Sequence, residues 1–122
     1  MTNLELKQLR QLFFLSQAEA AEHIGHVEVR SWQRWEKGTH AIPCDVIQKV
    51  QMISLIYHDL LSVEPDLSHY NYQYFDSLDE YEKASNVRSV IQWRLSQSIS
   101  AQLLSEKLAS IWRVEETIND ED

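Results

Sequence analysis

Start and stop signals in the first 40 residues divide this part of the chain into short helices. The sequences TNLE at 2–5 and SQAE at 16–19 have the spacing of a capping box, in which a hydroxyl and a carboxylate bond each other's backbone amides at the start of a helix. Gly25 and Gly38 supply the left-handed backbone that commonly closes a helix. Between these signals, apolar residues recur at helical spacing. We therefore expect three helices, over about 3–14, 17–24 and 28–37.

The rest of the chain is also expected to be mainly helical, because it offers few signals for strands. The 122 residues include only two glycines and two prolines, too few for a sandwich of many short strands. Pro43 suits the first turn of a fourth helix, which we expect to run to about residue 61. Its predicted buried stripe is Val46, Ile47, Val50, Ile53, Ile56 and Leu60.

The second half of the chain has a less regular pattern. The turn formers within 62–71 predict a linker, and 72–75 is compatible with a short strand. Ser77 then caps a short helix that ends near Asn86. Residues 87–91 fit a strand or a helix, whereas 93–112 has the apolar spacing of a long helix.

Two short helices joined by a tight glycine turn, with longer helices on either side, form a helix-turn-helix pattern. The predicted fold class is therefore mainly α, with a helix-turn-helix bundle of four to five helices over residues 1–62. A small C-terminal domain over 63–114 is expected to be helical, with one or two short strands at most. The tail, 115–122, holds five acidic residues among eight and is expected to be disordered.

Composition predicts a cytoplasmic protein. No apolar run approaches the roughly 20 residues that cross a bilayer, and the N-terminus lacks the apolar core of a signal peptide. Cys44 is the single cysteine, which excludes an internal disulfide. Four residues have a spacing like that of metal ligands, but they do not follow the order H-E-x-x-H, so we expect no metal and no cofactor. They are Glu19, Glu22, His23 and His26.

The net charge of −8 is unevenly distributed along the chain. Residues 1–50 carry six basic and six acidic side chains, so this half is neutral. Residues 51–122 carry five basic and thirteen acidic side chains and account for the whole excess of negative charge. An anionic partner is therefore expected to meet the first half of the chain.

The second helix of the helix-turn-helix pattern can enter a DNA major groove, and its polar side chains share one side. On a helical wheel, four hydrogen-bond donors fall within an arc of about 100°, whereas Trp32 and Trp35 fall on the opposite side. The tryptophans are therefore expected in the core and not as platforms for stacking nucleotides. The four donors are Arg30, Gln33, Arg34 and Lys37.

Each of these donors has a chemistry suited to duplex DNA. Arginine and glutamine can bond the edges of guanine and adenine with two hydrogen bonds, which makes Arg30, Gln33 and Arg34 candidate base readers. Lys37, near the helix end, suits a phosphate. Ser16 and Gln17, beside the free amides of a helix N-terminus, are further candidate phosphate contacts. The alternative is that this surface is the ordinary polar face of a soluble helix.

Three segments resemble the phage-repressor helix-turn-helix family. They are LSQAEAAEHIG at 15–25, SWQRWEKG at 31–38 and AIP at 41–43. The separation of Gly25 and Trp35 is one residue longer than is usual in that family. The segments MTNLELKQLR, EAAEHIG, RSWQRWEKG, AIPCDV and VIQWRLSQSISA also resemble the repressors encoded beside anti-CRISPR genes.

This second resemblance implies a homodimer with an N-terminal DNA-binding domain and a C-terminal dimerisation domain. It implies binding to an inverted repeat in a promoter and repression of the operon that contains the protein's own gene. It also implies Arg30, Gln33 and Arg34 as the base-reading residues. Some relatives bind the messenger RNA as well and repress its translation.

The apolar helix stripes and aromatic residues of the C-terminal half suit a dimer interface, and the resemblance favours the dimer over the alternative that these aromatics close a monomeric core. The candidate interface residues are Tyr72, Tyr74, Trp93 and Leu95. Two other functions remain open from the sequence. One is an RNA-binding translational repressor that uses the same arginines. The other is an antitoxin-like protein-interaction module whose acidic half wraps a basic partner.

Overall fold

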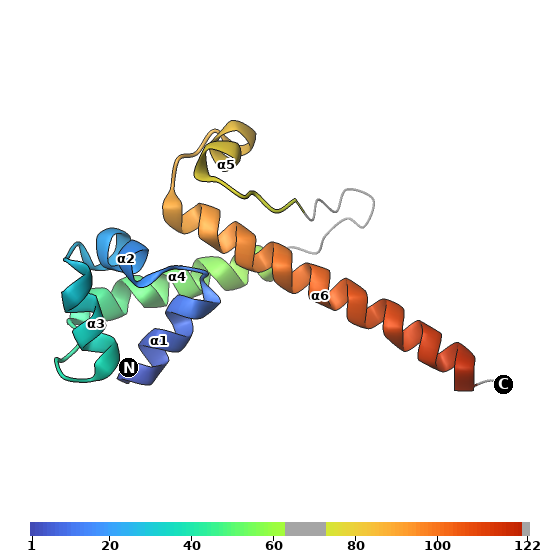
Figure 1. The fold of residues 1–122 in the computed structure, drawn as a ribbon, viewed down its shortest axis with the longest axis horizontal. Helices are drawn as coiled ribbons and strands as arrows, with labels where there is room; N and C mark the ends of the chain where they lie inside the picture. Colours follow the sequence, from blue (N-terminus) through green and yellow to red (C-terminus); the bar gives the residue numbers. More distant parts are fainter. Residues whose placement is uncertain (63–72, 121–122) are drawn as a thin grey trace.

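The computed structural model describes residues 1–62 and 73–120, with side chains described as far as Val114. Its helices are shown in chain order in Figure 1. They are α1 (Asn3–Leu12), α2 (Gln17–Ala20), the π-helix η1 (Ala21–Gly25), α3 (Val29–Lys37), α4 (Cys44–Ser62), α5 (Leu78–Ser85) and α6 (Val90–Asp120). The prediction of a mainly α fold is confirmed.

The expected C-terminal strands are absent from the residues that the structure describes. Residues 73–75 have no regular structure, and Tyr72 lies outside the described residues. The carbonyl oxygen of Phe75 accepts hydrogen bonds from Trp93 and Gln97 of α6, each at 2.8 Å. Because side chains of a helix bind this carbonyl, it is not available to a neighbouring strand. In the segment 87–91, for which the sequence fitted either a strand or a helix, α6 begins at Val90.

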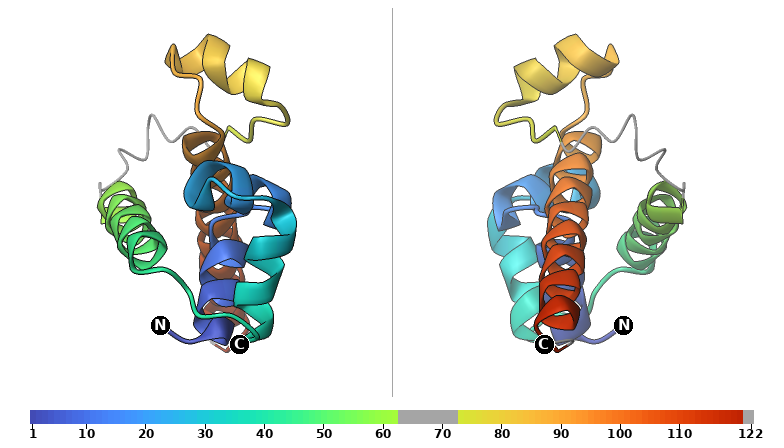
Figure 2. Two further views of the ribbon diagram at one scale, coloured as in Figure 1. Left: turned by 90° about the vertical axis from the view of Figure 1, so that its left-hand side faces the viewer. Right: turned by 90° about the vertical axis from the view of Figure 1, so that its right-hand side faces the viewer.

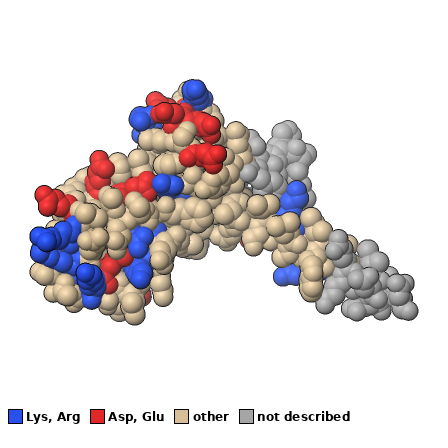
Figure 3. Space-filling view, in the orientation of Figure 1, with Lys and Arg blue, Asp and Glu red and all other residues tan. Residues whose placement is uncertain are grey.

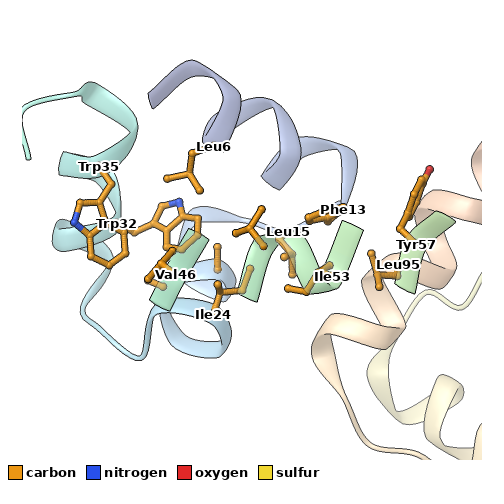
Figure 4. Close-up of a cluster of buried hydrophobic side chains, with 13 residues drawn as sticks. Leu6, Phe13, Leu15, Ile24, Trp32, Trp35, Val46, Ile53, Tyr57 and Leu95 are labelled. Atoms are coloured by element: carbon orange, nitrogen blue, oxygen red, sulfur yellow. The ribbon is translucent and has the colours of Figure 1, made fainter. Parts of the chain in front are cut away.

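One hydrophobic core joins α1 to α4, and the first half of α6 closes it. Figures 1 and 2 show α6 running alongside the N-terminal helices, and Figure 4 shows the side chains between them. The buried cluster is Leu6, Phe13, Leu15, Ala20, Ala21, Ile24, Trp32, Trp35, Val46, Val50, Ile53, Tyr57 and Leu95. Leu95 belongs to α6 and is 1% exposed. The predicted DNA-binding bundle and the predicted dimerisation segment therefore share a core.

Both predicted capping boxes are present. At the start of α1 the Thr2 hydroxyl accepts from the Glu5 amide at 3.1 Å, and the Glu5 carboxylate accepts from the Thr2 amide at 2.8 Å. At the start of α2, Ser16 and Glu19 make the same two bonds at 3.1 and 2.9 Å. Each box satisfies two amides that a helix N-terminus otherwise leaves unpaired.

The turn between the two short helices differs from the prediction. We expected Gly25 to end the first helix in a left-handed conformation, but the residue with that backbone is His26, with φ 51° and ψ 44°. The π-turn of η1 includes Gly25, and a π-turn accommodates one more residue than an α-turn. A Cβ atom at Gly25 would lie 3.0 Å from Val27 and 3.2 Å from Trp35. Close packing, and not left-handed backbone, therefore favours glycine there.

A second left-handed residue, Phe14, lies in the turn between α1 and α2. Its φ is 62°, and its side chain is 38% exposed. Left-handed backbone costs a residue with a side chain about 1–2 kcal/mol, and glycine loses about 0.5–1 kcal/mol more in entropy on folding than alanine. We expect Phe14→Gly to be more stable than Phe14→Ala by about 0.5–1 kcal/mol in urea denaturation, because both variants lose the same ring and only alanine keeps the left-handed strain. An alanine variant as stable as the glycine variant would contradict the prediction.

The buried stripe of α4 is partly as predicted. Val46, Val50 and Ile53 are buried, but the next buried position is Tyr57. Ile56 and Leu60 are 42% and 50% exposed, so their placement in the core was wrong. Tyr57 extends the spacing 46-50-53 by one helical step, which directs Ile56 and Leu60 away from the core.

The second half of α6 extends away from the body as a single helix (Figure 1). All side chains from Leu104 to Val114 are exposed. The helix continues to Asp120, where we expected a disordered tail from residue 115; residues 121–122 lie outside the described part. Despite its 31 residues α6 is not apolar enough to cross a membrane, and no other helix of the described ranges is either.

Candidate nucleic-acid interface

One side of α3 is anchored in the core by two tryptophans. Trp32 and Trp35 are 0% and 7% exposed, and their rings meet edge to face with centroids 5.6 Å apart. Figure 4 shows both rings turned toward the core from α3. The prediction that the tryptophans pack inward is confirmed.

The opposite side of α3 is a cationic surface in solvent. Arg30, Arg34 and Lys37 are exposed, and Gln33 is half-buried. Figure 3 shows several lysine and arginine side chains at the α3 end of the molecule, whereas acidic and basic atoms are mixed over α5. The structure thus brings the four predicted donors to one side of a helix that is fixed from behind.

A buried carboxylate fixes α3 to α1 and α2. Glu36 is 6% exposed, and its oxygens accept from Arg10 Nε at 2.7 Å and Arg10 Nη2 at 3.0 Å. Trp32 Nε1 and Gln17 Nε2 donate to the same carboxylate. A two-pronged arginine–carboxylate pair is directional as well as strong, so it sets the orientation of α3 relative to α1. Neither Arg10 nor Glu36 was predicted from the sequence as part of this site.

The pKa of Glu36 reflects opposing influences. Burial raises the pKa, because the charged form loses its hydration. Hydrogen bonds from Arg10, Trp32 and Gln17, together with the arginine charge, lower it by more. The net result is a pKa of Glu36 below its usual value, so the carboxylate is ionised at neutral pH.

Two glutamines carry this network to the exposed surface. Gln17 donates from Nε2 to Glu36 at 3.2 Å, and its Oε1 accepts from Gln33 Nε2 at 3.2 Å. The Gln17 side chain, predicted as a phosphate contact, is therefore also a support for a predicted base reader. Gln33 keeps one amide hydrogen and its own Oε1, which together are the pair that an adenine edge requires.

A surface hollow of about 270 Å³ lies beside these glutamines. Lys7, Gln17, Gln33, Glu36 and Lys37 line it. Both lysines are exposed, and the one carboxylate is already bonded to Arg10. Two ammonium groups around a hollow of this size match the charge of a phosphate. Lys7 was missing from the predicted site, since its position in the first helix gave no indication that it meets α3.

Ser16 lies at the edge of the same surface and is exposed. Its hydroxyl oxygen accepts from the Glu19 amide, and its own amide donates to the Glu19 carboxylate. The hydroxyl hydrogen remains available to donate to a phosphate. Its capping role and the predicted phosphate contact are therefore compatible.

Two of the predicted dimer-interface residues are not on the surface. Leu95 is 1% exposed within the core cluster, and Trp93 is 8% exposed with its indole nitrogen bonded to Phe75. Both side chains are thus buried within the protomer, and the assignment of Trp93 and Leu95 to a dimer interface stays a prediction. Tyr74 is 48% exposed, and Tyr72 lies outside the described residues.

The residues with metal-like spacing have other surroundings. Glu19 pairs with Arg94 of α6 at 3.1 Å, and Glu22 lies 3.8 Å from His23. Within residues 1–62 and 73–114, no three histidine, cysteine, aspartate or glutamate side chains come together as metal ligands.

Comparison with known proteins gives a consistent result. A family model described as Aca2/YdiL-like matches residues 1–111. The chain is 43% identical over 120 residues to the Aca2 repressor of Pectobacterium phage ZF40, with 91% of this chain and 99% of that protein covered. It is 25% identical over 114 residues to the uncharacterized protein YdiL of Escherichia coli strain K12, with 88% and 97% covered.

Proposed function

Since the chain belongs to the Aca2/YdiL-like family, we propose that it is a homodimeric DNA-binding repressor of transcription. It binds an inverted repeat and represses the operon of its own gene, of the type that contains anti-CRISPR genes. The observation that carries this proposal is the α3 surface, where Arg30, Gln33 and Arg34 face solvent from a helix that is locked to the core. The relative from phage ZF40 is itself named a repressor.

The base-reading part of the site is Arg30, Gln33 and Arg34. The two arginines are exposed and can each present a fork of donors to guanine. Gln33 is held by Gln17 at 3.2 Å, so little rotamer freedom is lost when it meets a base. A helix of this length in the major groove reads a few base pairs.

The phosphate-binding part surrounds the base readers. Lys37 and Lys7 both line the hollow beside Gln17, and Ser16 lies at the start of α2. Contacts of this kind fix register on the duplex without reading sequence. Their number sets the salt dependence of binding.

Dimerisation is supported by an apolar side of α6 that no part of the described chain covers. Its large side chains are 47–62% exposed. They share an arc of about 100° on the helix and are favourable to bury. They are Leu104, Leu108, Ile111 and Trp112. A second copy offers the same surface, and a twofold axis between two copies places two α3 helices on the two halves of an inverted repeat.

A gel-shift titration against the promoter of the protein's own gene tests the proposal. Arg30→Ala should weaken binding by about 1–3 kcal/mol, or roughly 5- to 150-fold, and relax sequence preference at one position of each half-site. Lys37→Ala is the matched control. It should weaken all sequences alike and reduce the salt slope by about one.

Two results would argue against this proposal. Equal affinity of the wild-type protein for the promoter and for scrambled duplex would remove the sequence-specific DNA function. A clear preference for the leader transcript over the promoter duplex would instead identify the arginines of α3 as RNA contacts.

A further inference from the structure

The helix that projects from the body is also firmly attached to the DNA-reading bundle. The Ser98 hydroxyl of α6 donates to the Leu12 carbonyl at 2.5 Å, and Tyr57 of α4 donates to Gln102 at 2.6 Å. Leu95 of α6 belongs to the shared core. Rotation of α6 against the bundle would therefore break contacts with both α1 and α4.

Arg94 adds a charged contact at the end of α6 nearest to α2. Its Nε lies 3.1 Å from both carboxylate oxygens of Glu19, and its Nη1 donates to Gln97 at 2.8 Å. The guanidinium also lies 4.0 Å from the centroid of the Trp93 ring. The Arg94 and Glu19 side chains are 27% and 21% exposed, so solvent only partly screens their attraction. Arg94 is thus held in one orientation by three neighbours.

Glu19 has two functions at the same time. Its Oε1 accepts from the Ser16 amide at 2.9 Å, which completes the capping box of α2. The same carboxylate accepts from Arg94. It therefore joins the first turn of α2, which borders the proposed phosphate contacts, to the helix proposed to form the dimer.

We propose that Arg94 is a positioning residue, which through Glu19 holds each DNA-reading bundle at one angle to α6 and so restricts the dimer to one half-site spacing. This inference rests on the proposed function. One additional base pair moves a half-site by about 3.4 Å and turns it by about 35°. A bundle held by Arg94, Leu95 and Ser98 cannot follow that turn without breaking contacts with α6.

The experiment uses the full-length protein and duplexes with the promoter inverted repeat, whose central spacer is native, one base pair longer or one base pair shorter. The wild-type protein should lose about 30-fold or more in affinity on either altered duplex, as loss of a half-site predicts. In Arg94→Gln the penalty should be clearly smaller than in wild type but not abolished, because Leu95 and Ser98 still hold α6 against the bundle. Glu19→Gln should behave in the same way, because glutamine keeps the capping box while the ion pair is lost.

Arg88→Gln is the matched control. Arg88 also contacts two carboxylates, but both Asp79 and Glu82 belong to α5. The Arg88→Gln variant should lose as much affinity on the altered spacers as the wild-type protein does. Thermal unfolding of each variant fixes a temperature at which all are folded, and Glu19→Gln replaces Arg94→Gln if the latter does not fold.

The ratio of affinities between native and altered spacers separates positioning from a purely structural role. A structural role lowers affinity for all three duplexes by one factor and leaves the ratio unchanged, which would overturn the inference. A wild-type protein that tolerates all three spacers equally would also overturn it. A wild-type protein that does not prefer the native duplex over scrambled DNA would refute the proposed function itself.

Discussion

Replacement of Glu36 by alanine is expected to lower the free energy of unfolding by about 3–5 kcal/mol, which is the cost of removing one partner of a buried ion pair. Glu36 is 6% exposed and accepts hydrogen bonds from Arg10, Trp32 and Gln17. Without the carboxylate, the guanidinium of Arg10 stays buried without its counter-ion. Urea denaturation followed by tryptophan fluorescence measures the effect, because the buried Trp32 becomes exposed to water when the protein unfolds.

The matched control is Glu82→Ala. Glu82 also pairs with an arginine, at 2.6 Å from Arg88, but the two side chains are 42% and 57% exposed. Exposed pairs contribute about 0–1 kcal/mol, so this variant should unfold almost as wild type does. Equal losses in the two variants would mean that burial adds nothing to the Glu36 pair.

The same carboxylate makes stability depend on pH. The pKa of Glu36 in the folded protein lies below 4.5, its ordinary value, so between the two values the unfolded chain binds more protons than the folded protein does. The stabilisation by ionised Glu36 is therefore fully present above pH 4.5 and is lost as the pH falls through the folded-state pKa. Glu36→Gln should flatten this acidic part of the stability profile, and an unchanged profile would assign the pH dependence to other groups.

Elements defined by local signals could be predicted from the sequence. The capping boxes at 2–5 and 16–19 depend on residues three apart, so the sequence states them directly. The burial of Trp32 and Trp35 follows from their three-residue spacing opposite a polar arc. The family resemblance to anti-CRISPR-associated repressors was also visible in the sequence and is confirmed by the Aca2/YdiL-like match.

Features that depend on contacts between distant residues could not be predicted in the same way. Arg10 and Glu36 are 26 positions apart, and Gln17 and Gln33 are 16 apart, so each pair is visible only when the helices are packed. Glu36 did carry a signal, because on the helical wheel it falls about 40° from Trp32, on the buried side. A charged residue on an apolar side usually has a partner.

The C-terminal half shows that an apolar pattern alone does not distinguish a buried position from an exposed one. Leu95 and Leu108 both belong to the apolar pattern of α6, yet one is 1% and the other 58% exposed. The difference arises because the first half of α6 contacts the N-terminal bundle, whereas the second half extends beyond it (Figure 1). The position along α6 at which contact with the bundle ends cannot be predicted from the sequence.

Leu108→Arg is expected to dissociate the proposed dimer and to weaken binding to the promoter repeat by about 100-fold or more. A monomer contacts one half-site at a time, so it loses the affinity that a dimer gains by binding both half-sites together. Leu108 is 58% exposed in the protomer, so the substitution should change the free energy of unfolding of a single chain by less than about 0.5 kcal/mol. A charge at this position would have to lose its hydration when a second copy covers the apolar side of α6. Light scattering measures the mass, and gel shifts measure the affinity.

Ser110→Arg is the matched control, because it adds the same charge to an exposed position of α6 about 200° around the helix from Leu108. It should leave both the mass and the promoter affinity as in wild type. If Leu108→Arg remains dimeric, the dimer contact lies elsewhere, and the groove of about 500 Å³ beside Ile56 and Leu60 is the next surface to substitute. If the variant becomes monomeric but keeps full promoter affinity, a single α3 helix is sufficient for binding and the inverted repeat is not read by two copies together.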